Sequence, residues 1–167
     1  EILIGLVGSE MCIRDRQNSV NWYFQAIDSQ LGINRVQEFL NKIEYGNQTT
    51  SSNLDLYWSD FSLKISPLEQ VTLLKKFNTN EFHLNSQNVF SVKNAIKIAS
   101  TPNGNFYGKT GTGRVNGQDI NGWFIGYVET SDNSYYFATN IQSDSNATGK
   151  KAFEITSDIL KKLHIWN

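Results

Sequence analysis

The chain has 167 residues, a formal net charge of −1, 39% hydrophobic and 13% aromatic residues. This length and composition predict one modest globular domain with a substantial core, and they argue against intrinsic disorder and against a basic nucleic-acid-binding surface. The single cysteine and the two isolated histidines have no metal-ligand spacing, so we expect no metal site and no internal disulfide.

Residues 1–16 show no helical or strand period, and they resemble translated sequencing-adapter DNA. We therefore expect native sequence to begin near Gln17 and take residues 17–167 as the domain. An irregular native extension is the alternative. The only cysteine, Cys12, lies in this first stretch and then gives no information about the redox compartment.

The first half of the domain has the spacing of helices. Apolar side chains recur every three or four residues over 18–31 and 33–44, which predicts two amphipathic helices separated by Gly32. Residues 45–64 are rich in Gly, Asn, Ser and Thr and are predicted to form a long loop. Loops of that length inside a compact domain are usually functional.

Two more helices are predicted before the sequence changes character. Ser66, Pro67 and Glu69 form a helix start, in which Ser and Glu make a capping box and Pro takes the first helical position. This helix should end near Asn78, and apolar spacing predicts another over 86–99.

The remainder is typical of strands followed by one helix. Residues 106–110, 122–129 and 134–141 are rich in aromatic and β-branched side chains, with a turn at 130–133. Both faces of the middle strand are apolar, so both should be covered. A helix over 149–163 follows. We expect its buried face to carry Ala152, Ile155, Ile159 and Leu163. The predicted class is α+β, an antiparallel sheet flanked by helices.

One polar triplet stands at the end of a predicted strand. Lys109, Thr110 and Gly111, with Thr112 following, offer a cation, a hydroxyl donor and close backbone access for an anionic ligand group. Taken alone the triplet is weak evidence, because a turn after an edge strand explains it equally well. Its significance depends on partners elsewhere in the chain.

Two candidate partners precede the triplet. Ser19 and Asn21 open the first predicted helix, where they could point into a cleft or Ser19 could simply cap the helix. Tyr45, Gly46 and Asn47 follow the second helix, where a Gly-Asn helix cap is the alternative.

In this order the motifs resemble the class D (oxacillinase-type) β-lactamases, and equally the sensor domains of Gram-positive β-lactam signal transducers. Trp123, within Gly-Trp-Phe, and Trp58, eleven residues after the Asn of Tyr-Gly-Asn, extend the match from residue 17 to the C-terminus. The resemblance implies a serine β-lactamase/penicillin-binding (transpeptidase-like) fold, of which we expect this chain to be the C-terminal part.

The resemblance also implies roles for individual residues. Ser19 would relay a proton to the departing lactam nitrogen, and Lys109 would supply positive potential. Thr110 would bind the substrate carboxylate, and the backbone N–H of Thr112 would form half of an oxyanion hole. Trp58 would pack beside the active-site lysine. A further position matches the family less closely. Lys150 or Lys151 stands where the family often has an Arg that pairs with the substrate carboxylate, with a solvated helix-start lysine as the alternative.

Two departures from the family pattern matter. No Ser-x-x-Lys occurs anywhere in the chain, so the nucleophile and the CO₂-carboxylated lysine that the family uses are absent. We therefore expect this chain alone to be neither acylated by penicillin nor hydrolytic, and we expect no other cofactor. Asn21 stands where most class D enzymes have Val. At this position the chain resembles the sensor domains more than the enzymes. An amide at that position should favour loss of the lysine carbamate.

The expected function of the intact protein is β-lactam hydrolysis through an acyl-enzyme. The alternative is an extracellular β-lactam sensor domain of a membrane signal transducer; a cell-wall transpeptidase and a non-catalytic binding module are further alternatives. The expected partners are β-lactam antibiotics, without nucleic acid or metal, and with a membrane only for the sensor. The resemblance implies an extracytoplasmic location.

Overall fold

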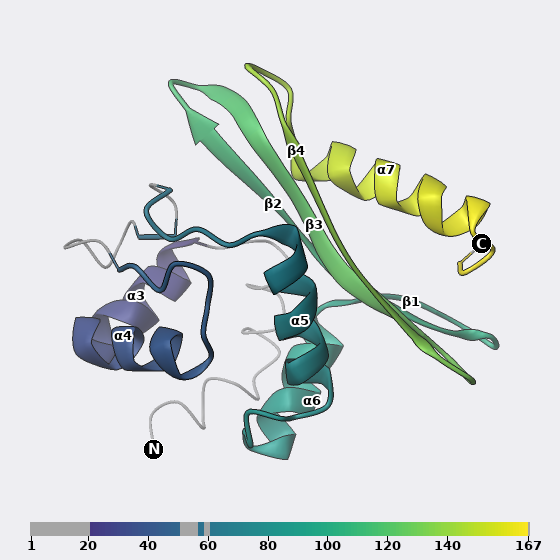
Figure 1. The fold of residues 1–167 in the computed structure, drawn as a ribbon, viewed down its shortest axis with the longest axis horizontal. Coiled ribbons are helices and arrows are strands. Elements are labelled where there is room, and N and C mark those ends of the chain that lie inside the picture. The colour runs from purple at the N-terminus through teal and green to yellow at the C-terminus, as the bar shows by residue number, and fades with distance from the viewer. Residues whose placement is uncertain (1–20, 51–56, 59–60, 167) are drawn as a thin grey trace. The chain divides into compact units, whose positions relative to one another are not determined.

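The computed structural model describes residues 21–50, 57–58 and 61–166 (Figure 1). Residues 1–16 and Ser19 lie outside the described residues. The chain divides into two compact units. The helical unit holds the described residues up to Glu69 together with Lys76–Ala95, and the sheet unit holds Gln70–Lys75 and the described residues from Ile96 onward. Helices followed by an antiparallel sheet confirm the predicted α+β class.

The helical unit begins with α3 (Asn21–Leu31) and α4 (Ile33–Lys42). Gly32, with φ of 78°, separates them, as the sequence predicts. The apolar stripe of α4 buries Val36 and Leu40 against Tyr57. Around these three pack the half-buried side chains of Leu31, Tyr45, Trp58 and Leu63. The loop after α4 therefore shares a core with the helix before it.

Helix α5 (Pro67–Asn78) begins and ends where the sequence predicts. The Ser66 backbone N–H donates to Glu69 Oε2 at 2.8 Å, and the Glu69 N–H donates to Ser66 Oγ at 3.2 Å. These two bonds are the reciprocal pair of a capping box. They also lower the pKa of the Glu69 carboxyl, through the side-chain and then the backbone hydrogen bond from Ser66.

Replacing Ser66 with alanine is expected to destabilise the chain by about 1 kcal/mol, because one helix-end N–H loses its acceptor. The lowered pKa of Glu69 adds stability that is present above pH 4.5 and lost as the pH falls through the folded-state value. Urea unfolding at pH 7 and at lower pH measures both. S66A should flatten the acid-side loss of stability, and an S66A variant with unchanged urea midpoints would contradict the capping role.

Helix α6 (Ser86–Ala95) ends earlier than predicted, and residues 97–99 belong to strand β1 (Lys97–Thr101) instead. The prediction of a helix to residue 99 is wrong. The β-branched residues Ile96 and Ile98 alternate with the polar Lys97, and this pattern fits a strand as well as a helix. Pairing with the following strand decides between them, since Ala99 to Thr101 pair with Phe106 to Gly104.

The sheet has the order β1-β2-β3-β4 and is antiparallel throughout. Strands β2 (Gly104–Val115), β3 (Gln118–Thr130) and β4 (Ser134–Gln142) all occur near their predicted positions. There are four described strands rather than three, and β2 and β3 are longer than predicted. They meet at Asn116-Gly117, whose φ values of 48° and 78° are typical of a type I′ hairpin turn. The predicted turn at 130–133 is confirmed, with the Thr130 N–H donating to Asn133 O at 2.9 Å.

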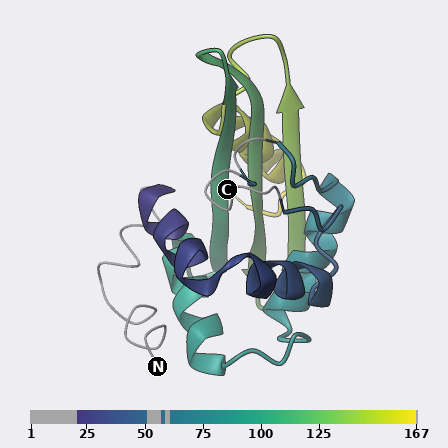
Figure 2. The same cartoon turned by 90° about the vertical axis from the view of Figure 1, so that its left-hand side faces the viewer.

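Helix α7 (Gly149–Lys162) lies along one face of the sheet (Figures 1 and 2). Its buried side chains are those of Ala152, Thr156 and Leu160, in line with Gly149. The predicted face is confirmed for Ala152 and wrong for the other three side chains: Ile155, Ile159 and Leu163 are 41%, 48% and 61% exposed. Small residues face the sheet because the helix approaches it closely, and the Thr156 hydroxyl bonds Thr139 of β4 at 2.7 Å.

The core of the sheet unit lies between α7 and the sheet. Phe106, Phe124 and Val128 are at most 3% exposed and pack with Ala152 and Leu160 of α7. The opposite face of β3 is also covered, because Tyr127 is fully buried and stacks on Tyr107 with ring centroids 4.6 Å apart. Trp123 and Ile125 on that face are half-buried, so the prediction that both faces of this strand are covered is confirmed in full for the face toward α7 and in part for the other. No helix among the described residues combines the length and hydropathy needed to cross a bilayer.

Candidate active site

The Lys-Thr-Gly triplet lies inside strand β2, where the sheet has an open edge. On the β1 side, pairing of β2 runs only from Gly104 to Tyr107, followed by a bond from the Gly108 N–H to Ile96 O at 2.8 Å. Backbone groups alternate in direction along an antiparallel strand, so the N–H groups of Thr110 and Thr112 point to the same side as that of Gly108. In the described part of the chain no strand pairs with them there.

Lys109 brings a cation to this edge. Its ammonium Nζ donates to the Thr110 carbonyl oxygen at 2.7 Å. The N–H groups and carbonyls of Thr110 and Thr112, with the Lys109 ammonium, therefore place both donors and acceptors along the open edge. Such an edge suits an extended ligand that carries a carbonyl and a carboxylate, which would add to the strand edge as a peptide does.

Trp123 lies on the neighbouring strand β3, directly opposite the triplet. It pairs with Gly111, and a Cβ built on Gly111 would lie 3.7 Å from the Trp123 Cβ. Lys150 lies in the first turn of α7, where its side chain is 85% exposed and its Nζ stands 3.9 Å from Glu154 Oε1. This placement fits the solvated-lysine alternative, and the carboxylate-binding role of Lys150 stays a prediction.

In the helical unit, Tyr45, Gly46 and Asn47 tie two parts of the loop together. The Asn47 side chain donates to Ser62 O at 2.7 Å and accepts from the Lys64 N–H at 2.9 Å. The Asn47 N–H donates to Lys64 O at 2.9 Å. This motif therefore closes the loop that carries Trp58, and it is not the helix cap of the alternative interpretation, because the C-cap of α4 is Ile43.

Trp58 is held by a residue that the sequence reading missed. Its indole N–H donates to Asp28 Oδ2 at 3.3 Å, and the Asp28 carboxylate also bonds the Tyr57 hydroxyl. Burial first, and then the negative charge of Asp28, raise the pKa of Tyr57. Asp28 is the only charged residue of α3, and a lone acid on an otherwise uncharged helix is the signal that could have identified it.

The structure brings Lys109, Thr110, Gly111 and Thr112 together with Trp123 in the sheet unit. In the helical unit it brings Tyr45, Gly46 and Asn47 together with Trp58. Asn21 is the exposed first residue of α3, and Ser19 lies outside the described residues. No cluster of three or more potential metal ligands occurs among the described residues.

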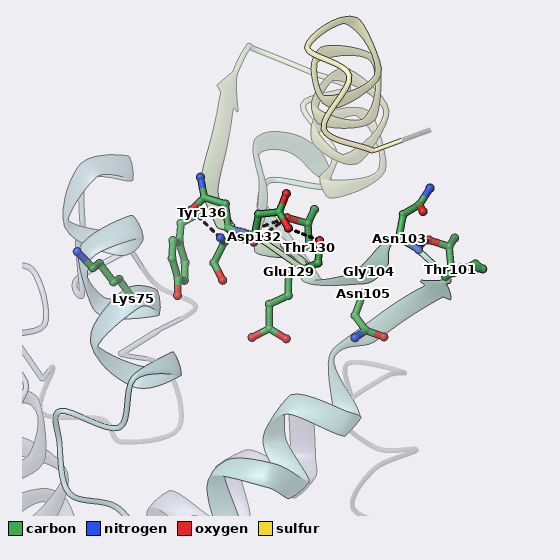
Figure 3. Close-up of a pocket in the computed structure, with 13 residues that line it drawn as sticks. Lys75, Thr101, Asn103, Gly104, Asn105, Glu129, Thr130, Asp132 and Tyr136 are labelled. Atoms are coloured by element: carbon green, nitrogen blue, oxygen red, sulfur yellow. Dashed lines mark hydrogen bonds between the residues drawn. The ribbon is translucent and has the colours of Figure 1, made fainter.

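A hollow of about 950 Å³ lies at another end of the sheet, and the triplet is not among the residues that line it. Figure 3 shows the hollow. The turns between β1 and β2 and between β3 and β4 line it, with Lys75, Glu129 and Tyr136 nearby. The Glu129 carboxylate bonds the Tyr107 hydroxyl and, after burial, contributes to raising the pKa of that phenol. The hollow is wide open, and it does not include Lys109 or its neighbours.

Comparison with known families agrees with the motif order. The penicillin binding protein transpeptidase domain matches residues 16–161. The chain belongs to this family. In a penicillin-binding transpeptidase domain, Lys-Thr-Gly accompanies a Ser-x-x-Lys nucleophile motif, and the 167 residues contain only the former.

Relatives of this transpeptidase domain include regulatory proteins and enzymes. The chain is 46% identical over 149 residues to regulatory protein BlaR1 of Bacillus licheniformis. This match covers 89% of this chain and 25% of BlaR1. It is 38% identical over 146 residues to the probable β-lactamase YbxI of Bacillus subtilis, covering 87% of this chain and 52% of YbxI. The chain thus spans between a quarter and about half of these proteins.

The solved C-terminal domain of the Bacillus licheniformis BlaR penicillin-receptor has the same architecture. It matches with a TM-score of 0.89 and 44% identity, over 93% of this chain and 63% of that chain. The predicted transpeptidase-like fold is therefore confirmed, and the described elements make up less than two thirds of such a domain.

Proposed function

We propose that this chain forms the Lys-Thr-Gly wall of a β-lactam-binding site, in a protein that the antibiotic acylates at a serine outside the 167 residues. The observation that carries the proposal is the open edge of β2. There the Thr110 and Thr112 N–H groups and the Lys109 ammonium face the same space. A β-lactam presents a carboxylate and an acyl carbonyl, which these donors could bind together.

The Thr112 N–H would act on the lactam carbonyl oxygen as the serine attacks. A backbone N–H aimed at developing negative charge stabilises the tetrahedral intermediate, and it needs no reorganisation because strand β2 holds it in place. Lys109 would contribute positive potential for the carboxylate. These roles come from the family resemblance and fit the direction of the backbone groups at the open edge.

Between the two functions open to such a protein, we propose the receptor: an extracytoplasmic sensor domain that stays acylated and signals the presence of the antibiotic. Two observations favour it. The identity to BlaR1 is 46%, against 38% to YbxI over a similar length. Asn21 also supplies an amide where an apolar side chain would keep a lysine carbamate dry. Hydrolysis through a short-lived acyl-enzyme is the second candidate, supported by the similarity to the probable β-lactamase YbxI.

The test is a chimera. Residues 21–166 replace the matching part of the solved BlaR receptor domain, which supplies the rest of its own chain including the nucleophile. The chimera is mixed with benzylpenicillin and followed by intact mass. A stoichiometric penicilloyl adduct supports the β-lactam-binding function, and a folded chimera without an adduct contradicts it. A chimera with Lys109→Met is the negative control for the open edge.

The same chimera separates receptor from hydrolase. We expect the adduct to persist, and Asn21→Val to shorten its lifetime by at least about tenfold, because the apolar side chain would retain the base that activates water. Asn21→Asp, which keeps a polar group there, is the matched control and should leave the adduct long-lived. If the parent chimera already hydrolyses many equivalents of benzylpenicillin, the receptor proposal is wrong and the protein is a β-lactam hydrolase.

A further inference from the structure

The start of helix α7 touches strand β2 at the candidate site. The Gly149 N–H, at the first position of the helix, donates to the Thr112 Oγ1 hydroxyl at 2.9 Å in a half-buried bond. The helix is capped in addition by Thr148, whose side chain accepts from the Lys151 N–H at 3.2 Å. One helix-end donor is therefore satisfied by a side chain of the candidate site rather than by the helix cap.

The approach is close enough to require glycine on both sides. A Cβ on Gly149 would lie 2.6 Å from Gly111 O and 2.9 Å from the Thr110 Cβ. A Cβ on Gly122, the β3 partner of Thr112, would lie 2.4 Å from Thr148 O. Such distances are shorter than real Cβ contacts. The first residues of α7 therefore rest directly on the backbones of β2 and β3 behind the open edge.

This contact lies where β2 has least other support. Beyond Tyr107 the strand has β3 on one side and, among the described residues, no strand on the other. A strand edge that must present N–H groups at fixed positions needs its backbone held from behind. The Thr112 hydroxyl can supply that hold, since its side chain and its edge N–H belong to the same residue.

We infer that Thr112 and Gly149 are positioning residues. Through the Gly149 N–H to Thr112 Oγ1 bond and the close backbone contact, helix α7 fixes the segment from Thr110 to Thr112, so that its edge N–H groups meet the ligand in register. The inference rests on the proposed function for its ligand, a β-lactam. The mechanical part, that α7 holds this segment, is testable without any ligand.

The test uses the 167-residue chain and amide hydrogen exchange by NMR. Thr112→Val keeps the side-chain shape and removes the acceptor, whereas Thr112→Ser keeps it. By alternation, the Gly111 and Gly113 N–H groups face β3 and report on the strand. We expect both to exchange about five- to tenfold faster in T112V, as expected for loss of one half-buried hydrogen bond, and within about twofold of the parent in T112S.

Thr139→Val is the matched control, because it removes another hydroxyl contact between α7 and the sheet, the 2.7 Å bond from Thr139 to Thr156, away from the site. Exchange at Gly111 and Gly113 that is unchanged in T112V, or raised equally in T112S or T139V, overturns the inference. Should T112V fold poorly, Gly149→Ala decides instead. The inference requires it to change exchange at those two glycines more than T139V does, and an equal effect overturns it.

The effect of the Thr112 hydroxyl on ligand positioning is measured as the rate of acylation of the chimera by benzylpenicillin. T112V should lower the acylation rate by about tenfold and T112S should restore it, while T139V leaves it unchanged. A T112V chimera acylated at the parent rate overturns the positioning of the edge even where exchange has changed. A parent chimera that is never acylated contradicts the proposed function instead. The hydrogen-exchange result then decides by itself whether α7 holds the strand.

Discussion

Replacing Phe124 with alanine is expected to lower the free energy of unfolding of the sheet unit by about 3–5 kcal/mol. The ring is 1% exposed, and its centroid lies 5.0 Å from that of Phe153 on α7 and 5.1 Å from that of Phe137 on β4. Removing it leaves a cavity between helix and sheet that neighbouring aromatic rings cannot fill without leaving their own contacts. Urea unfolding followed by near-ultraviolet circular dichroism measures the loss.

Phe90→Ala is the matched control, because it removes the same side chain from α6 where it is 58% exposed. It should cost less than about 1 kcal/mol, since surface changes away from special contacts are small. Equal losses in the two variants would mean that the Phe106, Phe124 and Phe137 cluster is not the core of the sheet unit.

Local sequence signals predicted the elements whose stability is local. The bounds of α5 follow from Ser66, Pro67 and Glu69, because a capping box and a first-turn proline act within one helical turn. The turn of the β2–β3 hairpin could have been predicted in the same way from Asn116-Gly117, which accepts the positive φ values that a type I′ turn needs.

Elements that depend on tertiary contacts were less predictable. Residues 97–99 fit either a helix or a strand until pairing with β2 is known. Ala152 was predicted on the buried face of α7 together with Ile155 and Ile159, but the helix lies so close to the sheet that Gly149 faces it in place of a large side chain, and Thr156 finds a partner in Thr139. Hydrophobic periodicity measures which side chains prefer burial, and it cannot measure how close two backbones come.

The candidate site shows the same division. The sequence named Lys109, Thr110 and Thr112, but placed them at a strand end, whereas they lie inside β2, where none of the described strands pairs with its β1-side edge. That edge exists because β1 is short, and the length of β1 cannot be predicted from the residues of the triplet. The contacts of Trp58 with Asp28 and of Thr112 with Gly149 join residues 30 and 37 positions apart, beyond the reach of local patterns. The catalytic roles themselves remain predictions.

Replacing Gly46 with alanine should be the most damaging single change in the helical unit. A Cβ at this position would lie 1.8 Å from Lys64 O and 2.8 Å from the Lys64 carbonyl carbon, and the φ of 49° already disfavours a side chain. Because both obstacles are backbone atoms, the loop must open and lose the Asn47 N–H to Lys64 O bond. We expect a loss of at least about 3 kcal/mol in urea unfolding, with displaced amide resonances of Lys64 and Ile65.

Gly32→Ala separates the effect of the positive φ from the effect of the clash with the Lys64 backbone. Gly32 also has a positive φ, 78°, but among the described residues no atom outside its own stretch of chain lies within 4 Å of the position of its Cβ. Its substitution should therefore cost only the conformational penalty, about 1–2 kcal/mol, and leave the resonances near Lys64 in place. If G46A and G32A lose the same stability, the contact between Gly46 and Lys64 is looser than the structure has it. The two hydrogen bonds of the Asn47 side chain to Ser62 and Lys64 would then contribute more to holding the loop than the Gly46 contact, and Asn47→Ala would become the decisive variant for the Tyr-Gly-Asn motif.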